Sequence, residues 1–377
     1  MKLLKTANGV YWVPGVKKSC IYDLNADKLY WISIDLYNTV DDYAQRGDFE
    51  SVETLLFSLG IPCEKNSVGV ESFTPPPYVC DILLLEISQR CNMSCEFCYA
   101  PSSQKDMDFD AFSEQWAKLR ELSPRSIRIV GGEPLLRMDF LKKLIVFLRH
   151  EFSGEILVYT NGILLSGEIC RFFADNKVGV SIAIKPFREQ VAEKGLILCR
   201  ENNVSVETLF LKDANSKPPS SVSPTRTDIV RLAGKATLDL YNFQLFKEKA
   251  ISKATFQCSG LTKWFKVSTS IHNCFGKKIL VDPEFYVFPC PMERSVKIGH
   301  LDEHDILGKI VNFGARFTKD RVESCKSCEF RYACRDCRAD RPNNDVYGKP
   351  WYCLYVPEKG IWESPEEKFD ALRCTFK

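Results

Sequence analysis

The stretch ISQRCNMSCEFCYAP, residues 87–101, places three cysteines within eight positions. Cys91, Cys95 and Cys98 follow the spacing C-x3-C-x2-C, which a chain with 17 cysteines is expected to contain by chance only about 0.03 times. A tetrahedral zinc site, or an iron–sulfur cluster bound entirely by protein, needs four cysteine or histidine ligands. Three thiols in one loop therefore indicate either a fourth ligand from elsewhere or a coordination position that is left open.

The composition limits the class of protein. The chain has 377 residues, 45% of them hydrophobic, which is enough for two or three domains with packed cores. A net charge of +2, with acidic and basic residues mixed along the chain, gives no electrostatic signature of binding to nucleic acid or to an anionic membrane. No apolar run approaches the roughly 20 residues of a membrane span, and the first residues lack the apolar region of a secretory signal. We therefore expect a cytoplasmic protein, whose cysteines bind metal or take part in catalysis rather than form disulfides.

A second group of cysteines crowds between residues 274 and 353. Four of them follow the spacing C-x2-C-x5-C-x2-C, whereas the two cysteine pairs of a zinc ribbon usually lie further apart. Seven or eight thiols are enough for two [4Fe–4S] clusters if one ligand is supplied from elsewhere, and two zinc sites remain an alternative. The seven are Cys274, Cys290, Cys325, Cys328, Cys334, Cys337 and Cys353.

From residue 81 onward, apolar runs alternate with amphipathic stretches of helical period. Such alternation predicts an α/β fold, in which helices cover a parallel sheet that curls into a partial (β/α)6 barrel. In such folds the chemistry lies at the carboxyl ends of the strands, and the three-cysteine loop directly follows the first strand. The six predicted strands are residues 81–88, 126–130, 155–160, 178–184, 204–211 and 236–243.

The N-terminal part has a different pattern. Residues 9–34 read as three short strands, two helical segments follow, and FTPPPY at 73–78 reads as a linker. A strand–helix unit with an available edge strand suits a small winged-helix-like module, which could bind an extended peptide as an added strand. We expect the edge at residues 20–24 or 28–32. An extension that merely buttresses the main domain is an equal alternative.

Together these features resemble the radical S-adenosylmethionine (SAM) superfamily. The cysteine loop has the aromatic Phe97 before its third cysteine, and IVGGEP at 129–134 follows the second strand. The resemblance implies that Cys91, Cys95 and Cys98 bind three irons of a [4Fe–4S] cluster and leave the fourth iron to SAM. One electron would cleave SAM to methionine and a 5′-deoxyadenosyl radical, which abstracts a hydrogen from the substrate.

The same resemblance implies the residues that bind SAM. The two glycines of GGEP let the backbone approach a ligand, the glutamate offers a carboxylate to the methionine ammonium, and the proline fixes the turn. TNG at 160–162 fits the family's turn after the third strand. On the fourth strand Ala183 stands where an acid is expected near the ribose, which leaves Ser181 or Lys185 as candidates. The implied residues are Phe97, Gly131, Gly132, Glu133, Pro134 and Ser181.

The late cysteines resemble the SPASM extension of radical SAM enzymes, which holds two auxiliary clusters. The resemblance implies a nearer auxiliary group, whose fourth ligand is either Cys258 or an open iron that meets the substrate. It also implies a farther auxiliary group. The nearer group is Cys274, Cys290 and Cys337, and the farther group is Cys325, Cys328, Cys334 and Cys353.

SPASM enzymes mostly modify peptides or proteins. Pro291 follows Cys290 where sulfatase maturases have an acid, and the nearest acid is Glu293, which argues against sulfatase maturation. The N-terminal module resembles the leader-binding domains of enzymes that mature ribosomally made peptides, above all those of grasp-with-spasm clusters. The implied function is an oxygen-sensitive radical SAM/SPASM maturase that crosslinks a precursor peptide, with no catalytic base identified.

The partners and domains follow from this reading. The implied partners are the precursor peptide, an electron donor such as flavodoxin or ferredoxin, and an ATP-grasp ligase, with neither nucleic acid nor membrane. The alternatives are a radical SAM enzyme acting on a protein, a small molecule or an RNA, and a non-catalytic iron–sulfur protein that binds peptides. The expected domains are a peptide-recognition module (1–72), a linker (73–80), a radical SAM core (81–250) and a SPASM domain (251–377).

Overall fold

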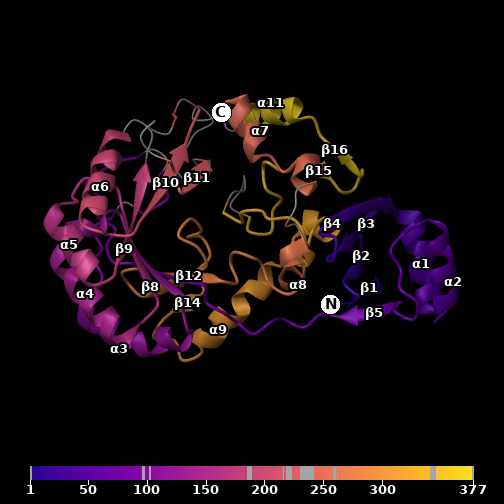
Figure 1. The fold of residues 1–377 in the computed structure, drawn as a ribbon, viewed down its shortest axis with the longest axis horizontal. Helices are drawn as coiled ribbons and strands as arrows, with labels where there is room; N and C mark the ends of the chain where they lie inside the picture. Colours follow the sequence, from indigo (N-terminus) through magenta and orange to yellow (C-terminus); the bar gives the residue numbers. More distant parts are fainter. Residues whose placement is uncertain are drawn as a thin grey trace.

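The structure is a computed structural model that describes residues 2–95, 98–101, 103–184, 189–214, 216–217, 223–229, 242–257, 260, 262–339 and 345–375. The molecule is elongated, with a curved sheet and its helices at one end, the N-terminal module at the other, and C-terminal segments between them (Figure 1). Among the described residues, no helix combines the length and the apolar character that crossing a membrane requires.

The main sheet has nine strands in the order β11-β10-β9-β8-β7-β6-β12-β13-β14. The strands from β6 to β11 run parallel, and β12 joins them in parallel beside β6. A partial parallel barrel is thus confirmed, and it is extended by the antiparallel pair β12–β13. The strands are β6 (Ile82–Glu86), β7 (Ser126–Val130), β8 (Glu155–Thr160), β9 (Gly179–Ile184), β10 (Val206–Lys212), β11 (Arg226–Ile229), β12 (Lys278–Val281), β13 (Tyr286–Phe288) and β14 (Gly299–His300).

The sixth parallel strand differs from the sequence prediction. The predicted strand at 236–243 lies outside the described residues up to position 241, and Phe243 begins a helix. The sixth strand that the structure describes is β11, which pairs in parallel with β10. The polar sequence RTDI gave no apolar run by which this strand could be recognised.

Four helices cover the outer face of the barrel (Figure 1). Alternate strand residues such as Leu83 and Leu85 share one core with apolar residues of these helices, while Leu84 belongs to a small separate cluster on the other face of the sheet. Asp108 and Ser166 cap two of the helices by accepting backbone N–H bonds. The helices are α3 (Phe109–Glu121), α4 (Met138–Glu151), α5 (Gly167–Asp175) and α6 (Glu189–Glu201).

The N-terminal module is a five-stranded antiparallel sheet with two helices. Its order is β4-β3-β2-β1-β5, so β4 and β5 are the edges and β3 is an inner strand. The expectation of an edge at residues 20–24 is therefore wrong, and the alternative at 28–32 falls on the edge strand β4. The sequence reading missed β1 and β5. The elements are β1 (Lys2–Ala7), β2 (Val10–Pro14), β3 (Lys18–Asp23), β4 (Lys28–Ser33), β5 (Gly69–Ser72), α1 (Ile34–Gln45) and α2 (Phe49–Ser58).

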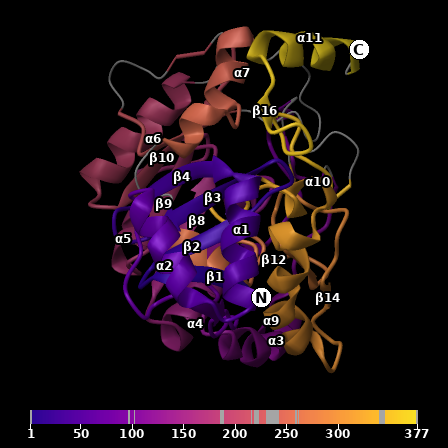
Figure 2. The same cartoon turned by 90° about the vertical axis from the view of Figure 1, so that its right-hand side faces the viewer.

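Both faces of this small sheet are covered at its inner strands β2 and β3. Trp12 and Ile21 pack in one cluster with residues of α1 and α2, which cover the outer face (Figure 2). On the opposite face, the ring of Tyr11 stacks on Phe265 with centroids 5.1 Å apart, and the Tyr22 hydroxyl donates to the Glu329 carbonyl at 2.9 Å. The module is thus packed against the C-terminal part of the chain, an arrangement that both the buttress alternative and the peptide-recognition alternative allow.

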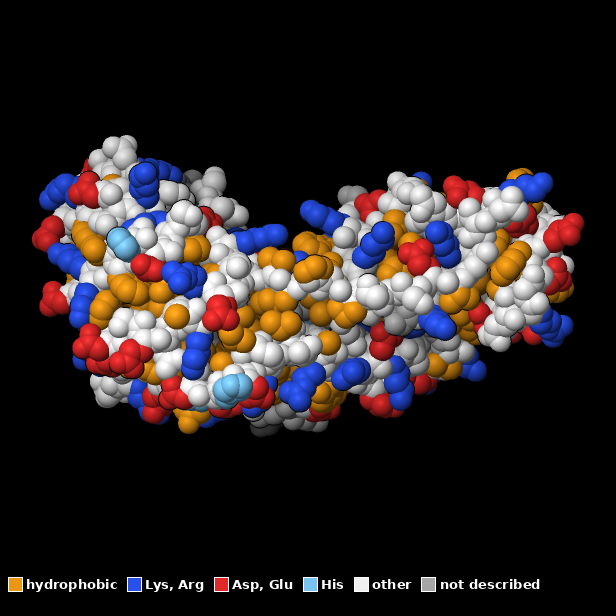
Figure 3. All heavy atoms as spheres, turned by 90° about the horizontal axis from the view of Figure 1, so that it is seen from below, with side chains coloured by type: hydrophobic (Ala, Val, Ile, Leu, Met, Phe, Trp, Pro, Cys, Tyr) orange, Lys and Arg blue, Asp and Glu red, His pale blue; other side chains and the backbone are white. Residues whose placement is uncertain are grey.

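The C-terminal part consists of short elements joined by long loops. Seen from below, hydrophobic side chains gather along the narrow middle of the molecule (Figure 3). The helices are α7 (Phe243–Lys249), α8 (Phe265–Ser268), α9 (Ile306–Phe313), α10 (Glu323–Lys326) and α11 (Pro365–Thr375), and the strands are β15 (Tyr355–Val356) and β16 (Ile361–Trp362). The 3-10 helices within the described residues are η1 (Pro134–Arg137), η3 (Lys253–Phe256), η4 (Thr262–Trp264), η5 (Gly314–Phe317) and η6 (Lys319–Arg321).

Candidate functional site

The three-cysteine loop follows β6 at the carboxyl edge of the parallel strands. Cys91 is exposed, whereas Cys95 and Cys98 are partly buried. The Cys98 N–H donates to the Cys95 carbonyl at 3.1 Å, which closes a tight turn between these two cysteines. The loop is tied to the end of β8 by Asn92, whose side chain accepts a hydrogen bond from Asn161 at 2.8 Å. Phe97, the aromatic residue before the third cysteine, lies outside the described residues.

The glycines of the GGEP turn seat this turn against the cysteine loop. A Cβ at Gly131 would lie 2.4 Å from the Ser88 carbonyl oxygen, and one at Gly132 would lie 2.3 Å from the Arg90 carbonyl oxygen. The same two carbonyls accept N–H bonds from Gly132 at 2.9 Å and from Glu133 at 2.8 Å. Only glycine allows two backbones to approach so closely. The approach of these glycines to a bound ligand stays a prediction.

Glu133 joins the ends of β7 and β8 from a fully buried position. Its carboxylate accepts the Leu135 N–H at 3.1 Å, the Thr160 hydroxyl at 2.8 Å and the Asn161 N–H at 2.8 Å. Gly162 completes the TNG turn with φ +84°, which favours glycine. The GGEP and TNG motifs therefore form one hydrogen-bonded unit, in which the neighbouring Pro134 is also buried. Contact of Glu133 with the methionine ammonium stays a prediction.

Replacing Glu133 with glutamine separates its role in holding the two turns together from its predicted role in binding SAM. In the wild type, three donors share the Glu133 carboxylate, and glutamine would place its NH2 group against one of them. We therefore expect the free energy of unfolding to fall by about 1–3 kcal/mol even without SAM. Thermal unfolding of the SAM-free protein measures this loss, and calorimetry measures SAM affinity. An unchanged melting temperature with weakened SAM binding would instead show that the carboxylate serves the ligand alone.

Ser181 lies on β9 and is 5% exposed. The strand register pairs it with Tyr159 of β8 and with Glu207 of β10, so these three side chains share one face of the sheet. The sequence analysis did not identify Glu207 as a neighbour of Ser181. The pattern within one strand does not reveal which residue lies opposite on the next strand. Lys185, the other candidate for ribose contact, lies outside the described residues.

The nearer auxiliary group gathers around the antiparallel pair β12–β13. Cys274 precedes β12 and Cys290 follows β13, and a hydrogen bond from the Cys290 thiol holds the pKa of Cys274 well below its usual range. Burial pulls the pKa of Lys278 down, but the thiols of Cys274, Cys290 and Cys337 bring it above its ordinary value. The structure thus brings the three expected cysteines together around one lysine. Cys258, the suggested fourth ligand, lies outside the described residues.

The four cysteines of the farther auxiliary group line a single cavity. Burial raises the pKa of Cys334 to about 11 and also raises that of Cys353, so a bound metal would have to displace the thiol protons. Among the described residues, no three Cys, His, Asp or Glu side chains converge on a position for one metal ion. That finding concerns single-ion sites and does not test a cluster, whose ligands are spread over several irons.

A partly buried ion pair, which the sequence analysis did not predict, connects the strand before the cysteine loop to the segment after Cys290 of the nearer auxiliary group. Glu86, 1% exposed at the end of β6, binds Arg294 through contacts of 2.7 and 3.3 Å. Burial of the hydroxyl raises the pKa of Tyr99, and the nearby thiols of Cys98 and Cys290 raise it further, although the whole residue is 39% exposed. Tyr99, which directly follows Cys98 in the first cysteine loop, therefore has a thiol of the nearer auxiliary group, that of Cys290, near its hydroxyl. Nothing local in the sequence signals this contact.

Comparison with known proteins agrees with this geometry. Residues 85–203 match the Radical SAM superfamily. A GTP 3′,8-cyclase of Clostridium perfringens is 26% identical over 188 residues, which cover 44% of this chain and 55% of the relative. A serine-type anaerobic sulfatase-maturating enzyme of Klebsiella aerogenes is 27% identical over 131 residues, which cover 31% of this chain and 32% of the relative. The chain spans only about half, or less, of the curated relatives it matches.

A solved structure has a similar fold over most of the chain. The structure of anSMEcpe with bound AdoMet has a TM-score of 0.53 at 14% identity, and the match covers 78% of this chain and 97% of that one. The same protein has also been solved with AdoMet and the Kp18Cys peptide. At this identity the likeness supports the fold alone.

Proposed function

Because residues 85–203 form a radical SAM domain, we propose that this chain is a radical SAM enzyme that modifies a peptide. The observation that supports it best is the seating of the C-x3-C-x2-C loop on the GGEP turn at the carboxyl edge of parallel strands. Formation of 5′-deoxyadenosine from SAM under a strong reductant tests the activity.

The residues at this edge fit an iron–sulfur cluster with one open coordination position. Cys91, Cys95 and Cys98 would hold the cluster, since three thiolates leave the fourth iron of a [4Fe–4S] cube free. When bound, this cluster supplies the electron that cleaves SAM. The protein's own contribution is placement, because Glu133 fixes the turn beside the loop and the Glu86–Arg294 pair fixes the neighbouring segment.

The two auxiliary groups of cysteines would hold two further clusters. The segment after Cys290 of the nearer group is tied to the end of β6 by the Arg294–Glu86 pair, which suits a cluster that accepts an electron from the substrate radical or binds a substrate thiol. The farther group has four buried or partly buried thiols around one cavity, a full ligand set for a [4Fe–4S] cluster. Residues 81–250 would then serve the radical chemistry, and 251–377 would hold the auxiliary clusters.

A precursor peptide is the substrate that the N-terminal module suits best. The module, residues 1–72, ends on one side in the edge strand β4, where Tyr30 and Trp31 are 38% and 37% exposed. An edge strand can bind an extended peptide through backbone hydrogen bonds, and micromolar affinity, about −8 kcal/mol, is typical of such pairing. An electron donor such as flavodoxin or ferredoxin and an ATP-grasp ligase complete the proposed partners. Turnover of a small molecule or RNA is the alternative, and the same assay with those substrates tests it.

Two neighbouring proline variants test the edge. Successive N–H groups of a strand point alternately to its partner and away from it, so one of Tyr30→Pro and Trp31→Pro removes a donor to β3 and the other removes a donor of the open edge. We expect the edge variant to melt near the wild type but to bind the precursor peptide at least tenfold more weakly. Fluorescence anisotropy with the labelled peptide measures this. Equal affinity in a well-folded edge variant would assign the recognition to another surface.

A further inference from the structure

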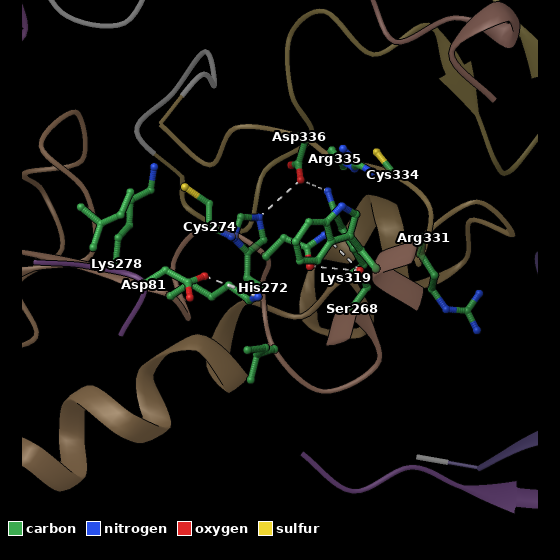
Figure 4. A pocket seen from close by; sticks show the side chains of 15 residues that line it. Asp81, Ser268, His272, Cys274, Lys278, Lys319, Arg331, Cys334, Arg335 and Asp336 are labelled. Atoms are coloured by element: carbon green, nitrogen blue, oxygen red, sulfur yellow. Dashed lines mark hydrogen bonds and ion pairs between the residues drawn. The ribbon is translucent and has the colours of Figure 1, made fainter. Parts of the chain in front are cut away.

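A cavity of about 340 Å³ lies between the two auxiliary groups of cysteines. Its wall includes Cys274 of the nearer group and Cys334 of the farther group, which lie on opposite sides in Figure 4. The cavity is also lined by Asp81 and Lys278, at the amino ends of β6 and β12, so it lies at the opposite edge of the barrel from the first cysteine loop.

A network of buried charges forms part of this wall. Asp336 contacts both Lys319 and Arg338, and these three side chains are 0%, 5% and 1% exposed. The Nε2 atom of His272 lies 3.5 Å from the same carboxylate, as Figure 4 shows. Its Nδ1 atom accepts the Cys274 N–H at 3.2 Å, so the ring is neutral in this arrangement and its hydrogen faces Asp336. The network therefore links the segment of Cys274 to that of the late cysteines.

Lys319 of this network also lines the cavity of the four cysteines of the farther group. Burying an ammonium group is costly unless negative charge opposes it. The thiols that act on Lys319 are those of Cys334, Cys325 and Cys353, all in the farther group. Anionic sulfur ligands at these positions would add to the opposing charge of Asp336.

The nearer group has its own lysine. Lys278 lines the same cavity and hydrogen-bonds to the Cys274 thiol, and its other thiol neighbours are Cys290 and Cys337. Each auxiliary group thus has one buried or partly buried lysine whose thiol neighbours belong to that group. A cysteine-bound iron–sulfur cluster gains a negative charge on reduction, and a nearby cation stabilises the reduced form.

We propose that Lys278 and Lys319 are paired positioning residues, each of which sets the reduction potential of one auxiliary cluster. The inference rests on the proposed function, since it presumes that both groups of cysteines hold clusters. Each cluster takes up one electron from dithionite through a mediator, and the adjacent ammonium group raises the potential at which it does so.

The experiment is a redox titration followed by electron paramagnetic resonance. The Cys91/Cys95/Cys98→Ala protein is used because only auxiliary signals remain in it. We expect Lys278→Met to lower one midpoint potential and Lys319→Met to lower the other, and arginine at either position to restore the value. Lys277→Met is the matched control, because Lys277 lines the same cavity but pairs with Asp81.

The outcomes separate the inference from its premise. Fewer than about eight irons in the background protein would contradict the two-cluster proposal itself. With both clusters present, unchanged potentials in the two methionine variants, or equal shifts of both potentials in each, would overturn the pairing. If a methionine variant loses iron only from the cysteine group beside the replaced lysine, the result supports a positioning role. If it loses iron from both groups, the assignment of one lysine to each cluster is overturned. Glutamine at the same position, which keeps a hydrogen-bonding end without the charge, tests whether the loss of iron comes from the charge or from the polar contact.

Discussion

Replacing Cys91, Cys95 and Cys98 together with alanine is expected to abolish SAM cleavage and to remove about four of about twelve irons per chain. The three thiols are the protein ligands proposed for the first cluster, and the other two groups of cysteines lie in the C-terminal part of the chain. Anaerobic reconstitution followed by iron and sulfide analysis measures the loss, and chromatography of 5′-deoxyadenosine measures the activity. The fold should remain, since Cys91 is exposed and contributes little to any core.

A matched control is Cys63→Ala, in the N-terminal module. Cys63 is a partly buried free cysteine that packs against the apolar cluster beneath α1 and α2, far in sequence from the proposed ligands. The Cys63→Ala variant should keep the full iron content and activity. A wild-type protein that takes up zinc and no labile sulfide, or a triple variant that still cleaves SAM, would contradict the assignment of the first cluster.

Replacing Gly132 with alanine is expected to have the second largest effect. The added Cβ would lie 2.3 Å from the Arg90 carbonyl oxygen and 2.9 Å from the Cβ of Cys91, so the cysteine loop must move. Overpacking of this kind costs about 1–3 kcal/mol, and here it also displaces a proposed cluster ligand. We expect loss of the first cluster's iron and at least a tenfold fall in SAM cleavage.

Gly308→Ala provides the control for this variant. Gly308 lies in α9, and an added Cβ there meets nothing within 4 Å. Alanine in a helix is favoured over glycine by about 0.5–1 kcal/mol, so this protein should melt slightly higher and keep its iron. If Gly132→Ala keeps full iron content and activity, the loop tolerates the movement and the close approach is not required.

The local motifs of the site could be predicted from the sequence, but their partners could not. The spacing of Cys91, Cys95 and Cys98 and the GGEP turn are properties of short stretches, and the structure places them together. The pairing of Glu86 with Arg294 joins residues 208 positions apart, and no local pattern encodes it. The same holds for β12, whose alignment beside β6 brings the nearer auxiliary group against the barrel.

The N-terminal part shows a similar limit. The strands with aromatic residues were recognisable, but β1 (KLLKTA) has no clear period-two alternation, and β5 (GVES) is short. The expected linker also has a packing role, because the ring of Phe73 lies 5.2 Å from Tyr11 and 5.8 Å from Phe265. Deleting residues 1–72 would uncover this aromatic cluster, so point variants in β4 test peptide binding more cleanly.

The central claim is that a radical formed from SAM acts on a peptide, and isotope transfer tests it most directly. A candidate precursor peptide is prepared with deuterium in place of its carbon-bound hydrogens, then incubated anaerobically with the enzyme, SAM and dithionite. The account predicts that 5′-deoxyadenosine gains deuterium. It also predicts that the peptide loses two hydrogen atoms, counted as H or D, for each crosslink formed. Unlabelled 5′-deoxyadenosine, formed at the same rate with and without an unchanged peptide, would contradict it.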